Sequence, residues 1–221
     1  MATYKDGRAH LPAYLDDYAF LADALVELLQ TRWRGADLEF AGQLAEVLLD
    51  QFEDPEHGGF FFTAREHEKL IHRSKTFADE SVPAGNGVAA GVLCRLGYLL
   101  GETRYLDSAE RTLQAAWAAM QEYPQAHMSL LNGLEDFLPS MQVLVIRGDA
   151  AGAAQWAREL GALYAPTRMI FAIPTGEELP PALAAKRAGA ATAAYLCTGM
   201  TCSAPLTNLA DISRALKLRV A

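Results

Sequence analysis

The chain has 221 residues, of which 51% are hydrophobic and 21% charged. This composition excludes a disordered or collagen-like protein, because the apolar content suffices for a buried core. Nineteen Lys and Arg residues against 27 Asp and Glu residues give a net charge of -8, so we expect no nucleic acid and no anionic membrane surface as a partner. The polar N-terminus and the absence of an apolar stretch long enough to span a membrane predict a cytoplasmic protein.

The first part of the chain is predicted to be a row of helices that alternate between buried and exposed. Two segments carry a single polar stripe and read as outer helices: Asp37–Phe52 and Arg104–Met120. Three segments are apolar on nearly every side and read as inner helices: Tyr18–Gln30, Gly87–Leu100 and His127–Leu138. Such alternation is typical of an α/α toroid, and an irregular helical bundle is the simpler alternative.

After Pro139 the pattern changes to short, β-rich, buried runs. The predicted strands are Gln142–Ile146, Arg168–Ile173 and Thr192–Cys197, and the predicted helices are Ala150–Leu163, Glu178–Arg187 and Leu206–Leu216. The order βαβαβ predicts a small parallel sheet. The expected fold is therefore mainly α: a partial α/α toroid in residues 1–140, followed by a small α/β segment in residues 141–221.

The topology predicts where a functional site would lie. In α/α hairpins the N-termini of the inner helices share one end of the layer, and the long connection 54–84 lies at that end. Long loops in compact helical domains usually carry function. We therefore expect a binding mouth there for a polyhydroxyl, sugar-like ligand, because carboxylates bind sugar hydroxyls and aromatic rings stack on sugar faces.

The candidate site residues of this mouth are of two kinds. Asp16 and Asp17 are the candidate catalytic pair, as general acid and base. The candidate ligand-binding residues are Tyr18, His57, Phe60, Arg73, Lys75, Asp79, Asn86 and His127. The histidines show no metal-ligand spacing with the carboxylates, so we expect neither a metal nor another cofactor.

Structural explanations compete with several of these roles. Either Asp16 or Asp17 is a candidate N-cap of the first inner helix, and Asn86 of the second. Phe60 and its neighbours could fill the toroid centre, His57 could serve a turn, and His127 could be a core histidine. Cys197 and Cys202 are separated by four residues, a spacing of neither a zinc knuckle nor a thioredoxin motif. We expect both to be reduced and partly buried, with redox chemistry as a minor hypothesis.

Several motifs together resemble one family. They are Leu15-Asp16-Asp17-Tyr18-Ala19, Gly58-Gly59-Phe60-Phe61, Arg73-x-Lys75-x-x-x-Asp79, Pro83-x-Gly85-Asn86 and Cys197-x-x-x-x-Cys202-x-x-Pro205. In order and spacing they resemble the spermatogenesis-associated thioredoxin-domain protein family, from about Leu11 to Leu216. The resemblance implies a six-hairpin α/α toroid similar to N-acylglucosamine 2-epimerases and six-hairpin glycosidases. It also implies that this chain is a C-terminal part, without the family's thioredoxin-like domain.

The sequence thus predicts a carbohydrate-related toroid protein that binds or acts on a sugar-like ligand, in the manner of an epimerase or a glycosidase. The alternative is a non-catalytic helical interaction module. Because a partial ring would expose apolar helix faces, we expect either a homo-oligomer or a partner that supplies the missing N-terminal part.

Overall fold

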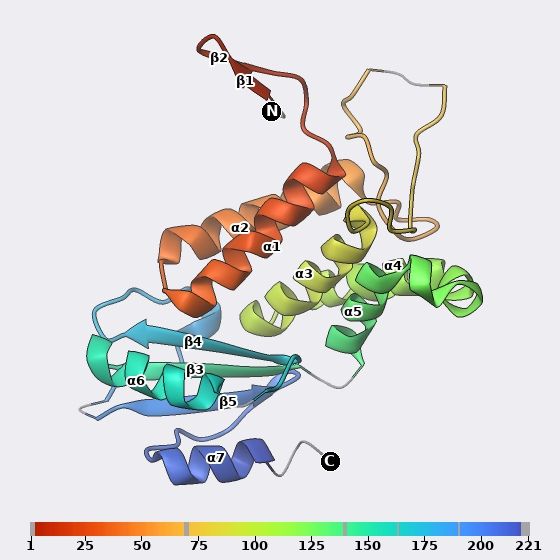
Figure 1. Cartoon of the computed structure of the whole chain (residues 1–221). Helices are drawn as coiled ribbons and strands as arrows, with labels where there is room; N and C mark the ends of the chain where they lie inside the picture. Colours follow the sequence, from red (N-terminus) through yellow and green to blue (C-terminus); the bar gives the residue numbers. More distant parts are fainter. Residues whose placement is uncertain (1–2, 69–70, 139–140, 163, 190, 218–221) are drawn as a thin grey trace.

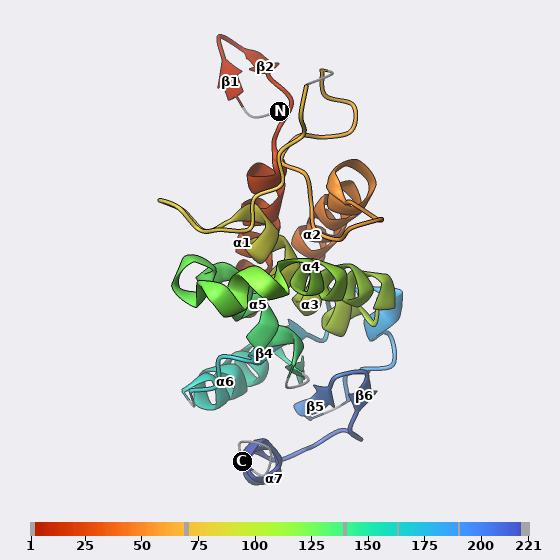
Figure 2. The ribbon, with the colours of Figure 1, turned by 90° about the vertical axis from the view of Figure 1, so that its right-hand side faces the viewer.

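The computed structural model describes residues 3–68, 71–138, 141–162, 164–189 and 191–217. A helical layer packs on a small sheet, and two further helices cover the other side of that sheet (Figure 1, Figure 2). The helices of the first layer are α1 (Leu15–Thr31), α2 (Gly35–Val47), α3 (Gly85–Leu100), α4 (Thr103–Glu122) and α5 (Met128–Phe137). A π-helical turn, η1 (Leu48–Phe52), extends α2, and a 3-10 turn, η2 (Pro124–Ala126), precedes α5.

The N-terminal ends of α1, α3 and α5 meet at one end of the helical layer. A Cβ added to Gly85 would lie 2.1 Å from an Asp16 side-chain oxygen, and one added to Gly87 would lie 2.1 Å from Ser129 Oγ. Glycine is therefore required where α3 begins, because a side chain there would collide with both neighbouring helices. The three helices expected to be inner thus start side by side.

The sheet is mixed, not parallel as predicted. Its strands are β3 (Gln142–Gly148), β4 (Arg168–Pro174), β5 (Ala193–Thr198) and β6 (Thr201–Cys202), in the order β4-β3-β5-β6. β3 pairs with β4 in parallel, through the crossover helix α6 (Ala150–Gly161), but with β5 antiparallel. The helix predicted at 178–187 is only the 3-10 turn η3 (Pro181–Leu183). Without a crossover helix the chain returns to β3 in the opposite direction.

The hydrophobic core is continuous between the helical layer and the sheet. Buried residues of α1, α2 and α3 share one cluster with Val143, Val145 and Phe171, and the Trp33 ring meets Phe171 edge-on at 5.8 Å between centroids. The opposite face of the sheet packs on α6 and α7 (Leu209–Lys217). Pro139 and Ser140, at the predicted boundary, lie outside the described residues.

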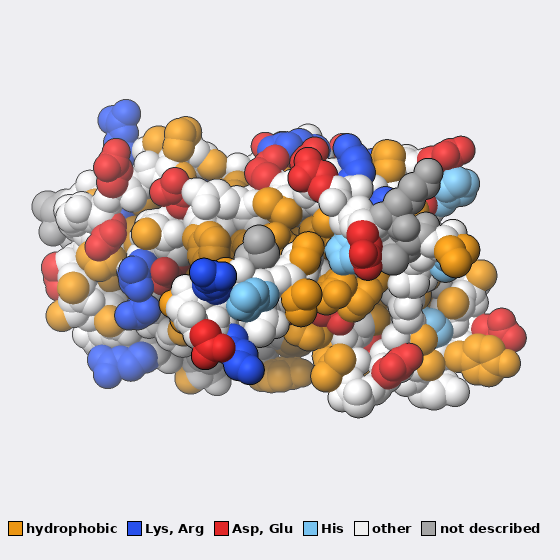
Figure 3. Space-filling view, turned by 90° about the horizontal axis from the view of Figure 1, so that it is seen from above, with side chains coloured by type: hydrophobic (Ala, Val, Ile, Leu, Met, Phe, Trp, Pro, Cys, Tyr) orange, Lys and Arg blue, Asp and Glu red, His pale blue; other side chains and the backbone are white. Residues whose placement is uncertain are grey.

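The N-terminal segment forms a small hairpin that the sequence did not reveal. Its strands, β1 (Thr3–Lys5) and β2 (Arg8–His10), are fully exposed and stand away from the helical layer in Figure 1. Viewed from above, this end of the molecule shows acidic, basic and apolar side chains interspersed with one another (Figure 3). Within the described ranges, no helix combines the length and apolar character needed to cross a bilayer.

Candidate functional site

Asn86 fastens the long connection 54–84 to the start of α3. Its Oδ1 accepts a hydrogen bond from Phe60 N at 2.7 Å, and its Nδ2 donates to Phe60 O and Thr76 O, both at 2.9 Å. The side chain is 1% exposed. Asn86 is not the N-cap of α3, which is Ala84, but lies in the first turn. Its amide is fully engaged by the protein's own backbone.

Asp54 and Lys75 form a buried ion pair within the same connection. Lys75 Nζ donates to Asp54 Oδ2 and to Gly58 O, both at 2.7 Å. Burial opposes ionisation of Asp54, but hydrogen bonds from Lys75 and from the amides of His57 and Glu56 outweigh it, lowering its pKa to about 2. His57 contributes its backbone to this turn, while its ring is 69% exposed.

The aromatic candidates are used for packing. Phe60 is completely buried, and the Tyr18 ring packs against Phe52 at 5.3 Å between centroids. Arg73 lies 4.2 Å above the Phe61 ring and donates to Thr63 O at 2.5 Å. Phe60 forms an isolated antiparallel bridge with Glu53.

Asp79 caps the N-terminus of α5. Its Oδ2 accepts from Ser129 N at 2.9 Å, and its Oδ1 accepts from Ser129 Oγ and Ala84 N. Burial raises the pKa of Asp79, but these hydrogen bonds outweigh burial and hold it below its ordinary value. His127, the residue before α5, is buried, and its Nδ1 lies 2.8 Å from Tyr123 O.

Asp16 and Asp17 have different environments at the start of α1. The N-cap is Tyr14, and Asp17 reaches back from the third helical position to accept from Tyr14 N at 2.8 Å. Asp16 lines a cleft of about 280 Å³ together with Phe62, Thr76 and Glu80. Burial, and then the charge of Asp17, raise the pKa of Asp16.

A larger groove of about 500 Å³ lies between α1, α3 and α5, beside this cleft, and shares Glu80, Val82 and Pro83 with it. We call it the acidic groove. Its polar wall includes Asp23, Glu80, Ser81, Arg95, Asn132 and Asp136. Of the sequence candidates only Asp79 also lines it. The volume falls in the range of small-molecule sites.

Arg95 organises the charges of the acidic groove. This residue of α3 pairs with Asp23 and, at 2.7 Å, with Glu27, both from α1, while its Nε lies 3.5 Å from Asp136 Oδ2 on α5. Three carboxylates thus surround one guanidinium that is 17% exposed. Burial raises the pKa of Asp136 to about 6; Arg95 opposes the rise, while Glu135, Asp23 and Glu27 add to it.

Asp23, Arg95 and Asp136 were missed as site residues by sequence reasoning. The available signal was Arg95 itself, the one charge in an otherwise apolar predicted helix. Asp23 and Glu27 lie one turn apart, on the same face of another nearly apolar predicted helix, and are acidic residues that could pair with Arg95. Across the parts of the chain that the structure describes, no group of three or more His, Cys, Asp or Glu side chains could hold a metal ion.

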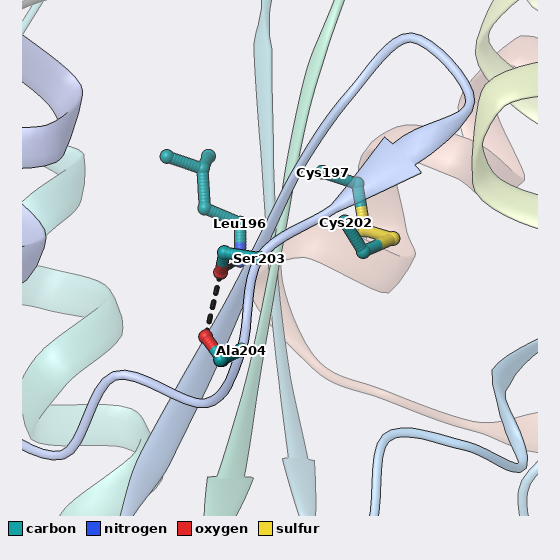
Figure 4. Close-up of a disulfide and its surroundings, with 5 residues drawn as sticks. All are labelled: Leu196, Cys197, Cys202, Ser203 and Ala204. Carbon is teal, nitrogen blue, oxygen red and sulfur yellow. Dashed lines mark hydrogen bonds between the residues drawn. A yellow bond between two sulfur atoms is a disulfide. The ribbon is translucent and has the colours of Figure 1, made fainter.

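Cys197 and Cys202 form a disulfide, so the expectation that both are reduced is wrong (Figure 4). The pairing of β5 with β6 places the two residues directly opposite each other, with Cα atoms 3.9 Å apart. A four-residue spacer therefore closes a tight hairpin. Cys197 is buried and Cys202 exposed. Disulfides are uncommon in reducing compartments. This disulfide therefore does not support the expectation of a cytoplasmic protein.

Comparison with known proteins identifies homologues over nearly the whole chain. It is 26% identical to spermatogenesis-associated protein 20 of Homo sapiens over 213 residues. This alignment covers 92% of this chain and 27% of the human protein. The protein of the same name from Mus musculus is 25% identical with the same coverage. An uncharacterized protein of Caenorhabditis elegans is 23% identical, covering 94% of this chain and 29% of that protein.

No family model matches the chain. The homologues nevertheless confirm the family resemblance drawn from the motifs, and they are consistent with a C-terminal part of that family. The chain spans about a quarter of the length of the curated relatives that it matches.

Proposed function

We propose that this chain, a homologue of spermatogenesis-associated protein 20, binds a sugar-like polyhydroxyl ligand in the acidic groove. In this proposal α1, α3 and α5 are inner helices and α2 and α4 outer helices of part of an α/α toroid. The groove extends from the N-terminal ends of α3 and α5, where the sequence predicts the mouth, to Asp23, Arg95 and Asp136 farther along the helices. The residues that would bind the ligand are those of the groove wall, which come from α1, α3, α5 and the last part of the connection 54–84.

One observation carries this proposal: Arg95 holds carboxylates of α1 and α5 on the wall of one groove. Carboxylates that are fixed by a guanidinium keep free lone pairs for ligand hydroxyls. Asn132 and Ser81 add exposed amide and hydroxyl groups on the same wall. A groove that offers both donors and acceptors suits a neutral polyol better than an anion, because its carboxylates outnumber its one cation.

The same wall contains the groups that an epimerase- or glycosidase-like reaction requires. Asp136, whose pKa burial raises to about 6, can hold a proton near neutral pH and act as an acid. Asp23, paired with Arg95, is the corresponding carboxylate. These two residues replace Asp16 and Asp17 as the pair that we propose for chemistry.

The test is a thermal-shift and calorimetric screen with neutral sugars, amino sugars and sugar alcohols. A ligand of the groove should raise the melting temperature of the parent protein. Asn132→Ala should weaken binding about three- to tenfold, because it removes one exposed hydrogen-bonding group. Gln43→Ala on α2 is the matched control, since Gln43 is exposed and lies far from the groove wall in sequence and on another helix. Equal affinities of parent and Asn132→Ala would contradict the proposal.

A second candidate function is association with a second copy of this chain through the solvent-exposed face of α1. Leu21 and Leu28 are 43% and 44% exposed and lie two turns apart, with exposed Ala24 between them. Asp17 precedes this apolar stripe and Arg32 follows it. A two-fold axis through the stripe would place each Asp17 near Arg32 of the other copy, so the face is complementary to itself.

Light scattering over a concentration series tests this association. The parent should shift from monomer to dimer as its concentration rises, and Leu21→Glu combined with Leu28→Glu should remain monomeric at every concentration. Because over two-fifths of each residue is already exposed, the double variant loses only part of its packing within the monomer and should keep its helical content. A parent that is monomeric throughout would refute the association.

A further inference from the structure

A separate pocket of about 340 Å³ lies between the end of α1, α6 and the start of β4, away from the acidic groove. We call it the Arg168 pocket. It is lined by Gln30 of α1, by Ala157 and Gly161 of α6, by Tyr164 of the segment before β4, and by Arg168 and Ile170 of β4. The two pockets share no lining residue. The function proposed for the acidic groove makes no use of this region.

Arg168 is a partly buried cation with no carboxylate counter-ion among the described residues. Its Nε donates to Gln142 Oε1 at 3.0 Å, while its Nη1 is buried and has no hydrogen-bond partner among the described residues. None of the described carboxylates lies within 4.0 Å of it. The residues outside the description include no Asp or Glu side chain. Burial alone lowers the pKa of Arg168.

The surroundings leave that charge available to a ligand. The amide of Gln30 is occupied, because its Oε1 accepts from Ile170 N at 3.3 Å and its Nε2 donates to Glu27. Glu27 is in turn paired with Arg95. Tyr164 stands at the rim, 91% exposed. Thus the pocket wall contains one uncompensated guanidinium, apolar surface from α6 and β4, and a phenol at the entrance.

We propose that the Arg168 pocket binds the oxyanion group, phosphate or carboxylate, of a small organic ligand. A guanidinium that is already partly desolvated loses less hydration when an anion binds than a fully exposed one, and its planar donors match the oxygens of either group. The protein carries a net charge of -8, so anions are repelled from most of its surface. Binding of an anion therefore requires such a local, uncompensated cation.

The test titrates the full chain with inorganic phosphate and, separately, with acetate, at constant ionic strength set by sodium chloride. One or both anions should raise the melting temperature saturably, and the anion that does so identifies a phosphate or a carboxylate ligand. Arg168→Gln should weaken binding about tenfold or more, because a charge-assisted contact is lost. Arg168→Lys should bind with intermediate affinity. Arg158→Gln, an exposed cation on α6, should bind like the parent.

A second measurement covers the case in which Arg168→Gln does not fold. In the parent, the side-chain Nε–H resonance of Arg168 should shift in nitrogen-edited NMR spectra as the anion is added, while that of Arg158 stays in place. The proposal is overturned if neither anion binds saturably, or if Arg168→Gln or Arg168→Lys binds as tightly as the parent. It is also overturned if the Arg168 resonance does not respond.

Discussion

Replacing Asn86 with alanine should lower the free energy of unfolding by about 3 kcal/mol. The substitution removes three hydrogen bonds and leaves Phe60 N, Phe60 O and Thr76 O without the partner that they have in the parent. These contacts are buried around a side chain that is 1% exposed, so water does not replace the amide cheaply. Urea denaturation followed by circular dichroism measures the change.

The loss should begin in the connection between η1 and α3, because Asn86 is its attachment to the helical layer. Hydrogen exchange should therefore accelerate around Phe60 and Thr76 before it changes in the sheet. Asn132→Ala is the control: the same amide is removed from an exposed helical position, and stability should change by less than about 0.5 kcal/mol. An Asn86→Ala protein within about 1 kcal/mol of the parent would show that the loop is held by other contacts.

The helices of the first part followed from the sequence because apolar periodicity records which faces are buried. The predicted inner helix Gly87–Leu100 is α3, Gly85–Leu100, and the predicted outer helix Arg104–Met120 is α4, Thr103–Glu122. Strand positions followed for the same reason. Strand direction did not, because direction depends on whether the connection forms a crossover helix. Pro180 and Pro181 begin only the short turn η3 instead of a helix.

Placing residues at the mouth was simpler than assigning their roles. Asp79 and Asn86 lie where the inner helices begin, as topology requires, but backbone groups occupy their polar atoms. A polar residue in a long loop must satisfy the loop's own buried amides before any ligand, and the sequence does not record these local bonds. The charges of the acidic groove come from helix interiors. There Arg95 of α3 pairs with Asp23 of α1, which is 72 residues away in the sequence.

Replacing Asp136 with asparagine should stabilise the protein above pH 6, by as much as about 3 kcal/mol. Burial raises the pKa of Asp136 from 3.8 to about 6, against the opposing charge of Arg95. The folded state therefore binds a proton that the unfolded state has released between about pH 4 and pH 6. The stabilisation that this bound proton gives is complete below about pH 4 and is lost as the pH rises through about 6. At higher pH the buried, ionised carboxylate of Asp136 destabilises the folded state by a constant amount.

Thermal or urea unfolding of parent and Asp136→Asn between pH 4 and pH 8 measures this effect as a difference. The two proteins should be about equally stable at pH 4 and diverge up to pH 6, and Asp54, whose pKa lies low in both, cancels from the comparison. A loss of stability in Asp136→Asn at pH 7.5 would mean that the pair with Arg95 outweighs the burial of the carboxylate.

The same variant connects stability to the proposed function. A side chain that costs stability at neutral pH is typical of a binding or catalytic site, where its chemistry outweighs its cost. Asp136→Asn should therefore be more stable than the parent at pH 7.5, and it should lose the acid proposed for the acidic groove. If a sugar ligand is bound by the parent, its affinity for the variant should fall, and any turnover should cease. A variant that gains stability and keeps full binding and turnover would mark Asp136 as a buried carboxylate without a functional role.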